Sequence, residues 1–206
     1  MRVKEYFAAG IVLLVGVLLL SSAGYGYQYL TVSGIVITAF PAQFDPPDLT
    51  DGLLAYWPME DGYGSTVSDW SGNGNHGTFT APTLPIWQPA AGRIGGALQF
   101  DGQGGHAVCP ASPLLDFAAG LTAMAWFKTD SLTRDWQAIV TKGDSAWRLH
   151  RLSNTDYLDF ACTGLTGGNN TWGSSVSGST PVVDNEWHHA AGVFNPYDES
   201  GQVRLY

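Results

Sequence analysis

From residue 53 onward, apolar residues alternate with polar or small residues in short runs, and glycine, proline, aspartate, asparagine or serine separates the runs. A period of two predicts β-strands with one buried face, and the separating residues predict tight turns. No stretch beyond residue 50 keeps the 3.6-residue period of an amphipathic helix for three turns. The pattern therefore predicts an all-β domain of two packed antiparallel sheets, a sandwich or jelly roll. The expected strands cover residues 53–59, 96–100, 106–110, 122–129, 135–142, 146–153, 157–163, 186–194 and 201–206.

The N-terminal segment has a different pattern. Arg2 and Lys4 precede an uncharged apolar run over residues 7–20, and small residues follow it. A basic start, a short apolar stretch and a small-residue exit are typical of a secretory signal, with cleavage expected after Ala23. The run is short for a membrane-spanning helix, which needs about 20 residues, although the tyrosines that follow would extend it as an interfacial belt. Residues 1–23 are therefore expected to form a helical signal peptide or an uncleaved membrane anchor, and either one would export the rest of the chain.

The next segment, residues 24–52, is expected to be a linker. Its second half, residues 41–52, is rich in proline and aspartate, and adjacent prolines favour extended backbone. The folded domain is then expected to span residues 53–206.

The charge of the chain excludes one class of partner. The 206 residues carry a net charge of −9, and only 13% of them are charged. Nucleic acid binding needs a basic face, so nucleic acid is not an expected partner. An acidic surface suits an exported protein or one that meets cations, although it also serves solubility alone.

The sequence offers no catalytic constellation. A retaining glycosidase needs two carboxylates about 5 Å apart, and no E-x-D-x-x-E strand that would supply them is present. The chain also lacks the G-x-S-x-G nucleophile elbow and the phosphate-binding P-loop. We therefore expect that this chain is not an enzyme.

Four stretches together resemble the laminin-G-like domains of the concanavalin A-like jelly-roll superfamily. They contain W-P, D-x-S-G-N-G-N-x-G, F-D-G, A-W-F-K and W-H-H-A, and they lie at residues 52–79, 92–110, 121–144 and 186–206. The resemblance implies a concanavalin A-like sandwich over residues 53–206. In that family the strand similar to "QVRLY" continues into a V-D-G turn and further strands, whereas this chain stops at Tyr206. We therefore expect the domain to lack its last strands, together with any residue that they contribute.

The resemblance implies a function outside the cell. The expected protein is a non-catalytic recognition or adhesion module, secreted or held at the cell surface, that binds glycans or extracellular proteins. Two alternatives stay open: an accessory carbohydrate-binding domain of a secreted glycoside hydrolase, and a purely structural spacer of a surface protein. A fold alone does not choose among them.

The stretch "DWSGNGNHG" that begins at Asp69 is the expected calcium site. Calcium prefers six to eight oxygen ligands. Asp69 supplies charge, Asn73 and Asn75 supply amide oxygens, and the glycines let backbone carbonyls turn inward. Glu60 or Asp61 would add a carboxylate, and in calcium-binding laminin-G-like domains a similar loop helps to hold the ion. The alternative is an asparagine–glycine turn without metal.

Aromatic and amide side chains next to predicted loops are the candidates for ligand binding. Trp136, Trp147 and Trp172 lie among polar residues, an arrangement that suits the stacking of sugar rings. Asn169 and Asn170 belong to the loop that composition favours most as a ligand site. Core packing is the alternative for each tryptophan.

Two cysteines complete the set of candidates. Cys109 and Cys162 lack the spacing of a zinc site. Outside the cytoplasm they would form a disulfide if the fold brings them together, and otherwise they remain buried free thiols.

Overall fold

The computed structural model describes residues 13–20, 52–80, 83–93, 95–115, 120–143, 146–162, 175–197 and 203–206. Within these ranges the chain forms fourteen strands and a single 3-10 helix, Pro113–Leu115. The prediction of an all-β fold is therefore confirmed for this part of the chain. No helix in these ranges has the length and hydrophobicity needed to cross a membrane.

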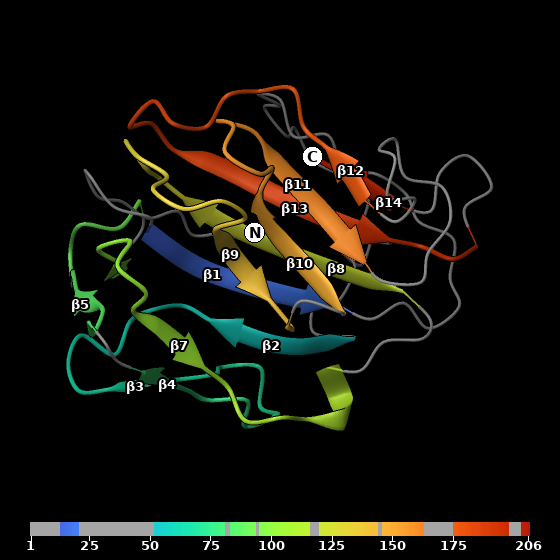
Figure 1. Ribbon diagram of the computed structural model, residues 1–206. Helices are drawn as coiled ribbons and strands as arrows, with labels where there is room; N and C mark the ends of the chain where they lie inside the picture. Colours follow the sequence, from blue (N-terminus) through green and yellow to red (C-terminus); the bar gives the residue numbers. More distant parts are fainter. Residues whose placement is uncertain are drawn as a thin grey trace, which may run out of the picture.

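The largest sheet has seven strands, and all of its pairings are antiparallel. The strand order is β14-β13-β8-β1-β6-β5, and β2 also pairs with β1. Figure 1 shows β2, β1, β8 and β13 side by side. The seven strands are β1 (Leu13–Leu20), β2 (Leu53–Trp57), β5 (Ile86–Trp87), β6 (Leu98–Gln99), β8 (Leu121–Phe127), β13 (His188–Phe194) and β14 (Val203–Leu205).

Two smaller antiparallel sheets complete the described fold. One has the order β12-β11-β10-β9 and the other the order β3-β4-β7. In Figure 1 the four-stranded sheet lies in front of β8 and β13, and the three-stranded sheet lies below it. Their strands are β3 (Thr66–Val67), β4 (Gly77–Thr80), β7 (His106–Val108), β9 (Ala138–Thr141), β10 (Trp147–Arg151), β11 (Leu158–Cys162) and β12 (Ser175–Ser177).

The core lies between the large sheet and the four-stranded sheet. Along β8, buried and half-buried residues alternate, and Ala123, Ala125 and Phe127 are fully buried. From the facing sheet, Leu149 and Phe160 are fully buried in the same apolar cluster. Burial of a side chain as large as phenylalanine stabilises a fold by about 1.5–3 kcal/mol. The burial along β8 thus has the period of two that a strand with one face toward the core requires.

One contact between these sheets depends on a glycine. A Cβ atom added at Gly192 on β13 would lie 2.1 Å from the ring of Phe160 on β11. No side chain fits at that distance, so Gly192 allows the two sheets to approach closely there.

Of the N-terminal segment the structure describes residues 13–20 alone, and the expected helix of residues 1–23 stays a prediction. Leu13–Leu20 is β1, which lies between β2 and β8 and pairs with both. An uncharged run of apolar residues is also the pattern of a strand that is buried on both faces, so hydrophobicity alone does not separate the two structures. Residues 1–12 and 21–23, and the predicted linker up to residue 51, lie outside the described residues.

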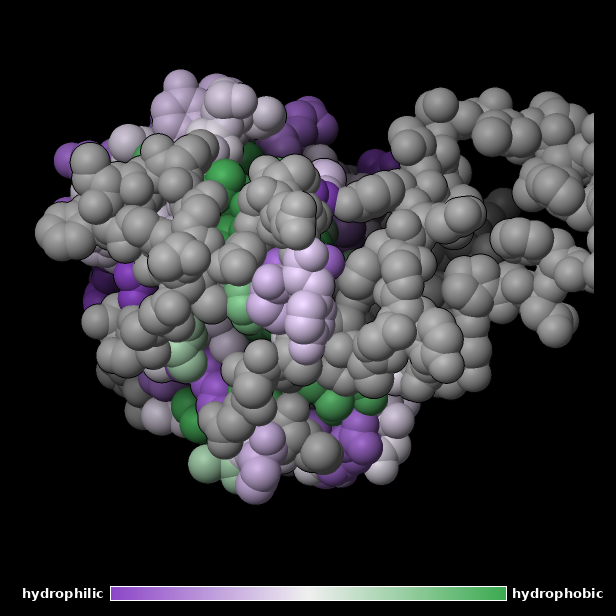
Figure 2. Space-filling view, turned by 90° about the vertical axis from the view of Figure 1, so that its right-hand side faces the viewer, coloured by the Kyte–Doolittle hydropathy of each residue, from purple (hydrophilic) through white to green (hydrophobic). Residues whose placement is uncertain are grey.

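All nine predicted strands of the folded domain are present, with ends that differ by up to three residues. The prediction omitted four strands of the domain, β3, β4, β5 and β12, which are only two to four residues long. Periodicity is not detectable over so few residues. On the face shown in Figure 2, the described residues are mostly hydrophilic, and hydrophobic residues appear as small separate patches.

Candidate functional site

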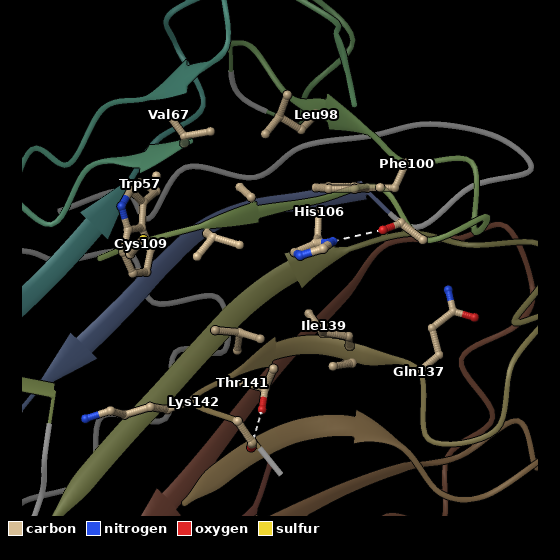
Figure 3. Close-up of a pocket in the computed structure, with 18 of the residues that line it drawn as sticks. Trp57, Val67, Leu98, Phe100, His106, Cys109, Gln137, Ile139, Thr141 and Lys142 are labelled. Atoms are coloured by element: carbon tan, nitrogen blue, oxygen red, sulfur yellow. Dashed lines mark hydrogen bonds between the residues drawn. The ribbon is translucent and has the colours of Figure 1, made fainter. Parts of the chain in front are cut away.

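A cleft of about 750 Å³ lies between the three-stranded and the four-stranded sheet. Residues of β7 line one side of it and residues of β9 line the other. This volume is within the range of pockets that bind small ligands, about 300–1,000 Å³. Figure 3 shows the two sides, with Trp57, Val67, Leu98, Phe100 and His106 on one side and Gln137, Ile139, Thr141 and Lys142 on the other.

The inner wall of the cleft is apolar. It contains buried side chains from five strands, so a ligand that enters would displace water from a hydrophobic surface. They are Trp57, Val67, Leu98, Ile139 and Trp147.

The rim of the cleft is polar, and its loop before β9 is held by hydrogen bonds. The guanidinium Nη2 of Arg134 donates to the carbonyl oxygen of Gln103 at 3.0 Å. The side-chain oxygen of Gln137 accepts from the backbone N–H of Thr133 at 3.1 Å and from that of Arg134 at 3.3 Å. Asp135 is the single carboxylate among the described residues that line the cleft.

Trp136 lies on this rim and is the most exposed tryptophan of the cleft, with 48% of its surface accessible. Its backbone has φ of 58°, a left-handed conformation that is rare for a residue of this size. Its N–H donates to the carbonyl oxygen of Ser153 at 3.1 Å, and its ring lies 5.6 Å from the ring of His150. The loop thus presents an aromatic face to solvent at the entrance of the cleft.

The other predicted ligand residues have different positions. Trp147 is 6% exposed and belongs to the core cluster, and it also lies on the inner wall of the cleft, so a ligand role for it stays a prediction. On β10 it shares a strand face with Leu149, which is fully buried. Asn169, Asn170 and Trp172 lie outside the described residues.

The predicted calcium loop folds around the carboxylate of Asp69, which is 6% exposed. One carboxylate oxygen, Oδ1, accepts from the backbone N–H groups of Tyr56 and Ser71, both at 2.9 Å. The other oxygen, Oδ2, accepts from the hydroxyl of Ser71 and the backbone N–H of Asn75, both at 2.8 Å. Burial alone would raise the pKa of Asp69, but these four hydrogen bonds to the charged form outweigh burial and lower it.

The two asparagines of the loop attach it to β2. The amide Nδ2 of Asn75 donates to the carbonyl oxygen of Leu54 at 2.8 Å, and the indole N–H of Trp57 donates to the carbonyl oxygen of Asn75 at 2.7 Å. Because Trp57 also lines the cleft, the loop directly supports one of its walls. Gly72 and Gly74 have φ of 91° and 73°, which lets the chain turn between these contacts.

Several oxygens gather around the side chain of Asn73. Its Nδ2 lies 2.8 Å from the carbonyl oxygen of Leu53, 3.2 Å from that of Leu54 and 3.3 Å from the hydroxyl of Ser71. An amide NH₂ has only two hydrogens for three acceptors. These are neutral oxygens of the kind that calcium uses. The carbonyl and hydroxyl oxygens around Asn73 are therefore suitable ligands for calcium. Asp69 is the carboxylate nearest to them in sequence.

Glu60 and Asp61 face other partners. The carboxylate of Glu60 accepts from the backbone N–H of Gly96 at 3.2 Å, and that of Asp61 accepts from the N–H of Ser68 at 3.0 Å. No three acidic, histidine or cysteine side chains cluster as a metal site among the described residues. A calcium ion in the loop would thus rely on Asp69 together with amide, hydroxyl and backbone oxygens.

A buried polar row on the four-stranded sheet was not predicted. His150 is fully buried, its Nε2 lies 3.5 Å from Asp159 Oδ2, and the hydroxyl of Ser177 donates to Asp159 Oδ1 at 2.7 Å. In a serine hydrolase the hydroxyl would face the histidine instead, so the row is not a catalytic triad. His150 and Asp159 are cross-strand partners on β10 and β11, and the sequence alone does not give this pairing.

Both cysteines are free thiols in the structure. Cys109 follows β7 and Cys162 ends β11, so they belong to different sheets. Burial raises the pKa of Cys162 to about 12. Burial, with a contribution from the charge of Asp69, raises the pKa of Cys109 to about 11. The structure thus has two free thiols, with Cys162 buried and Cys109 half-buried on the wall of the cleft, and both are poor nucleophiles because their raised pKa values keep them protonated.

The described residues define the class of fold, an antiparallel β-sandwich with an open cleft. A family comparison agrees with this class: the sequence model of a laminin G-like family, described as the concanavalin A-like lectin/glucanases superfamily, matches residues 101–206. The match covers half of the chain, and the chain belongs to this family. Neither the curated proteins nor the solved structures contain a match to the chain.

Proposed function

We propose that this protein is an exported, non-catalytic recognition module that binds a glycan or an extracellular protein in the cleft between β7 and β9. The observation that carries the proposal is the cleft itself, which joins an apolar wall to a polar rim with the exposed ring of Trp136. Such a site gives affinity through apolar contact and specificity through a few polar groups.

The distribution of carboxylates supports a non-catalytic role. Glycoside hydrolysis uses two carboxyl groups, about 5–5.5 Å apart for retention or about 6.5–9.5 Å for inversion. Asp135 has no carboxylate companion among the described lining residues. An accessory carbohydrate-binding domain of a hydrolase would share this cleft, whereas a structural spacer would not need it.

Calcium in the loop of Asp69 is part of the proposal, as a structural ion. The ligands would be Asp69 and the oxygens around Asn73, after its amide turns its oxygen inward. Because Asn75 holds the indole of Trp57, an ion in the loop would stabilise one wall of the cleft.

Export is the remaining part of the proposal, and the apolar run of residues 7–20 supports it. Cleavage after Ala23 would remove β1 and leave its place between β2 and β8 empty. N-terminal sequencing of the exported protein separates the two states: a start at Gly24 identifies a signal peptide, and a retained N-terminus identifies β1 as part of the exported fold.

The binding role is tested with the full chain on a glycan array and on a panel of purified extracellular-matrix proteins. We expect at least one saturable ligand, whose affinity falls about tenfold or more in Trp136→Ala. Tyr197→Ala is the matched control, because Tyr197 is a 76% exposed aromatic that does not line the cleft. Absence of any ligand, or equal losses in the two variants, would contradict the proposal.

A further inference from the structure

The backbone around Trp136 is strained. Trp136 has φ of 58°, and Ser153, whose carbonyl oxygen accepts from the N–H of Trp136 at 3.1 Å, has φ of 49°. A left-handed conformation is unfavourable for residues other than glycine, and it persists only where the surrounding contacts enforce it. The hydrogen bond between the two residues therefore joins two strained positions, and further contacts must hold both of them.

The guanidinium of Arg151, at the end of β10, supplies two of these contacts. Its Nη1 donates to the carbonyl oxygen of Arg134 at 3.1 Å, shortly before Trp136 in the chain. Its Nε donates to the carbonyl oxygen of Thr155 at 2.6 Å, shortly after Ser153. One side chain thus joins the loop that carries Trp136 to the turn that carries Ser153.

The burial of Arg151 indicates that these contacts are the role of the residue. Arg151 is 8% exposed, and none of the ion pairs of the described residues includes it. A guanidinium stays charged, and its removal from water is unfavourable unless hydrogen bonds or a counter-ion compensate. An apolar side chain of similar volume would avoid this cost. Arginine at this position is therefore explained by the two carbonyl oxygens that it joins, rather than by packing.

The contacts of Arg151 also determine where the ring of Trp136 lies. The backbone N–H of Arg151 donates to the carbonyl oxygen of Gln137 at 2.8 Å, so the loop is held on the far side of Trp136 as well. The ring of Trp136 lies 5.6 Å from the ring of His150, the neighbour of Arg151 on β10. Nε and Nη1 belong to one rigid plane and hold two acceptors at a fixed separation, whereas the ammonium of lysine is a point charge on a flexible chain. Arg151 itself does not line the cleft.

We propose that Arg151 is a positioning residue for ligand binding. Its guanidinium fixes the backbone on both sides of the bond between Trp136 and Ser153, so that the indole ring stays at the entrance of the cleft in one orientation. This inference rests on the proposed function in that Trp136 contacts the ligand, and it adds a residue that sets the affinity without touching that ligand. The dependence of the Trp136 orientation on Arg151 is the part that can be measured in the free protein.

The first measurement needs no ligand. The full chain is labelled with fluorotryptophan, and the fluorine NMR resonance of Trp136 is identified as the one that is missing from Trp136→Phe. We expect this resonance to shift or split in Arg151→Lys, and also in Arg151→Met, which removes the buried charge. The other tryptophan resonances should keep their positions, which shows that the fold is intact. Arg204→Lys is the matched control: it makes the same exchange on β14, in the large sheet, and should leave the Trp136 resonance unchanged.

The second measurement uses the ligand of highest affinity from the glycan array and the matrix-protein panel. Arg151→Lys should weaken its binding about tenfold, and it should cause no further loss in a chain that carries Trp136→Ala, because residues that act through one contact are not additive. An unchanged Trp136 resonance in both Arg151 variants, or an equal loss of affinity with and without Trp136→Ala, would overturn the inference. If Trp136→Ala leaves the affinity unchanged, or if no ligand is found, the proposed function fails, and the fluorine resonance alone decides whether Arg151 positions Trp136.

Discussion

The sharpest stability prediction concerns Asp69→Asn. The amide keeps one oxygen, which still accepts from the N–H groups of Tyr56 and Ser71. On the other side, an NH₂ group replaces the oxygen that accepts from the N–H of Asn75 and the hydroxyl of Ser71. The serine hydroxyl can rotate to accept, but the N–H of Asn75, which is 5% exposed, then faces a donor.

The magnitude follows from these contacts. Loss of a hydrogen bond to a charged group costs about 1.5–3 kcal/mol, and a buried donor without an acceptor costs about 1–3 kcal/mol. We expect Asp69→Asn to lower the free energy of unfolding by about 3–5 kcal/mol near neutral pH. That is a large share of the about 5–15 kcal/mol of a typical domain. Asp61→Asn is the control, because Asp61 accepts a single described hydrogen bond, from Ser68 at 3.0 Å, and we expect a loss of about 1 kcal/mol or less.

The pH dependence has a defined sign. The pKa of Asp69 in the folded protein is lowered, because its hydrogen bonds outweigh the effect of burial. Its ionised form therefore stabilises the fold above the unfolded-state pKa of about 3.9, and this contribution is lost as pH falls through the folded-state pKa. The difference between wild type and Asp69→Asn should thus be full near neutral pH and shrink in acid.

The assay is urea denaturation of the full chain, followed by tryptophan fluorescence with a calcium chelator present, at neutral and acidic pH. Equal effects of Asp69→Asn and Asp61→Asn, or a difference between wild type and Asp69→Asn that does not change in acid, would refute this reasoning.

Three further predictions concern the core, the thiols and the ion. Gly192→Ala should lower the free energy of unfolding by about 2 kcal/mol or more, because the added Cβ overlaps the ring of Phe160. Gly143→Ala is the control in the same urea experiment: it has open space around it but φ of 67°, so we expect a loss of about 1 kcal/mol. Cys109 and Cys162 should both be alkylated only after unfolding, since their raised pKa values keep them protonated; mass spectrometry of non-reduced protein would reveal a disulfide instead as two unlabelled cysteines. Millimolar calcium should raise the melting temperature relative to chelator, because an ion that binds the folded state stabilises it by RT ln(1 + [L]/Kd), and Asp69→Ala should abolish the increase. Identical melting in both buffers would leave the loop as a hydrogen-bonded turn.

The fold was predictable to the extent that hydrophobic alternation was long enough to detect. Burial alternates along all seven residues of β8, but its half-buried positions include Met124 and Trp126, so the sequence predicted the strand and not its inward face. The two residues of β3 or β5 contain no period. The run that includes Leu13–Leu20 is apolar throughout, which is compatible with a signal helix and with a strand between two others.

The candidate site was predictable only in part, because its parts are far apart in the sequence. The loop of Asp69 was identified by composition, and the structure shows that its polar atoms converge on β2. The cleft requires β7 and β9 to stand on opposite sides of a gap, and no local pattern states which strands remain unpaired. Trp136 and Trp147 have similar polar neighbours in sequence. Trp147 is buried because it belongs to β10, whereas Trp136 lies in a loop and is exposed.

The most direct measurement of the central claim is hydrogen exchange of the full chain, with and without the tightest ligand from the glycan and matrix-protein panels. If the cleft is the binding site, backbone amides of β7 (His106–Val108) and β9 (Ala138–Thr141), with the loop that contains Trp136, should gain protection on binding. Protection confined to other strands, with β7 and β9 unchanged, would contradict the account.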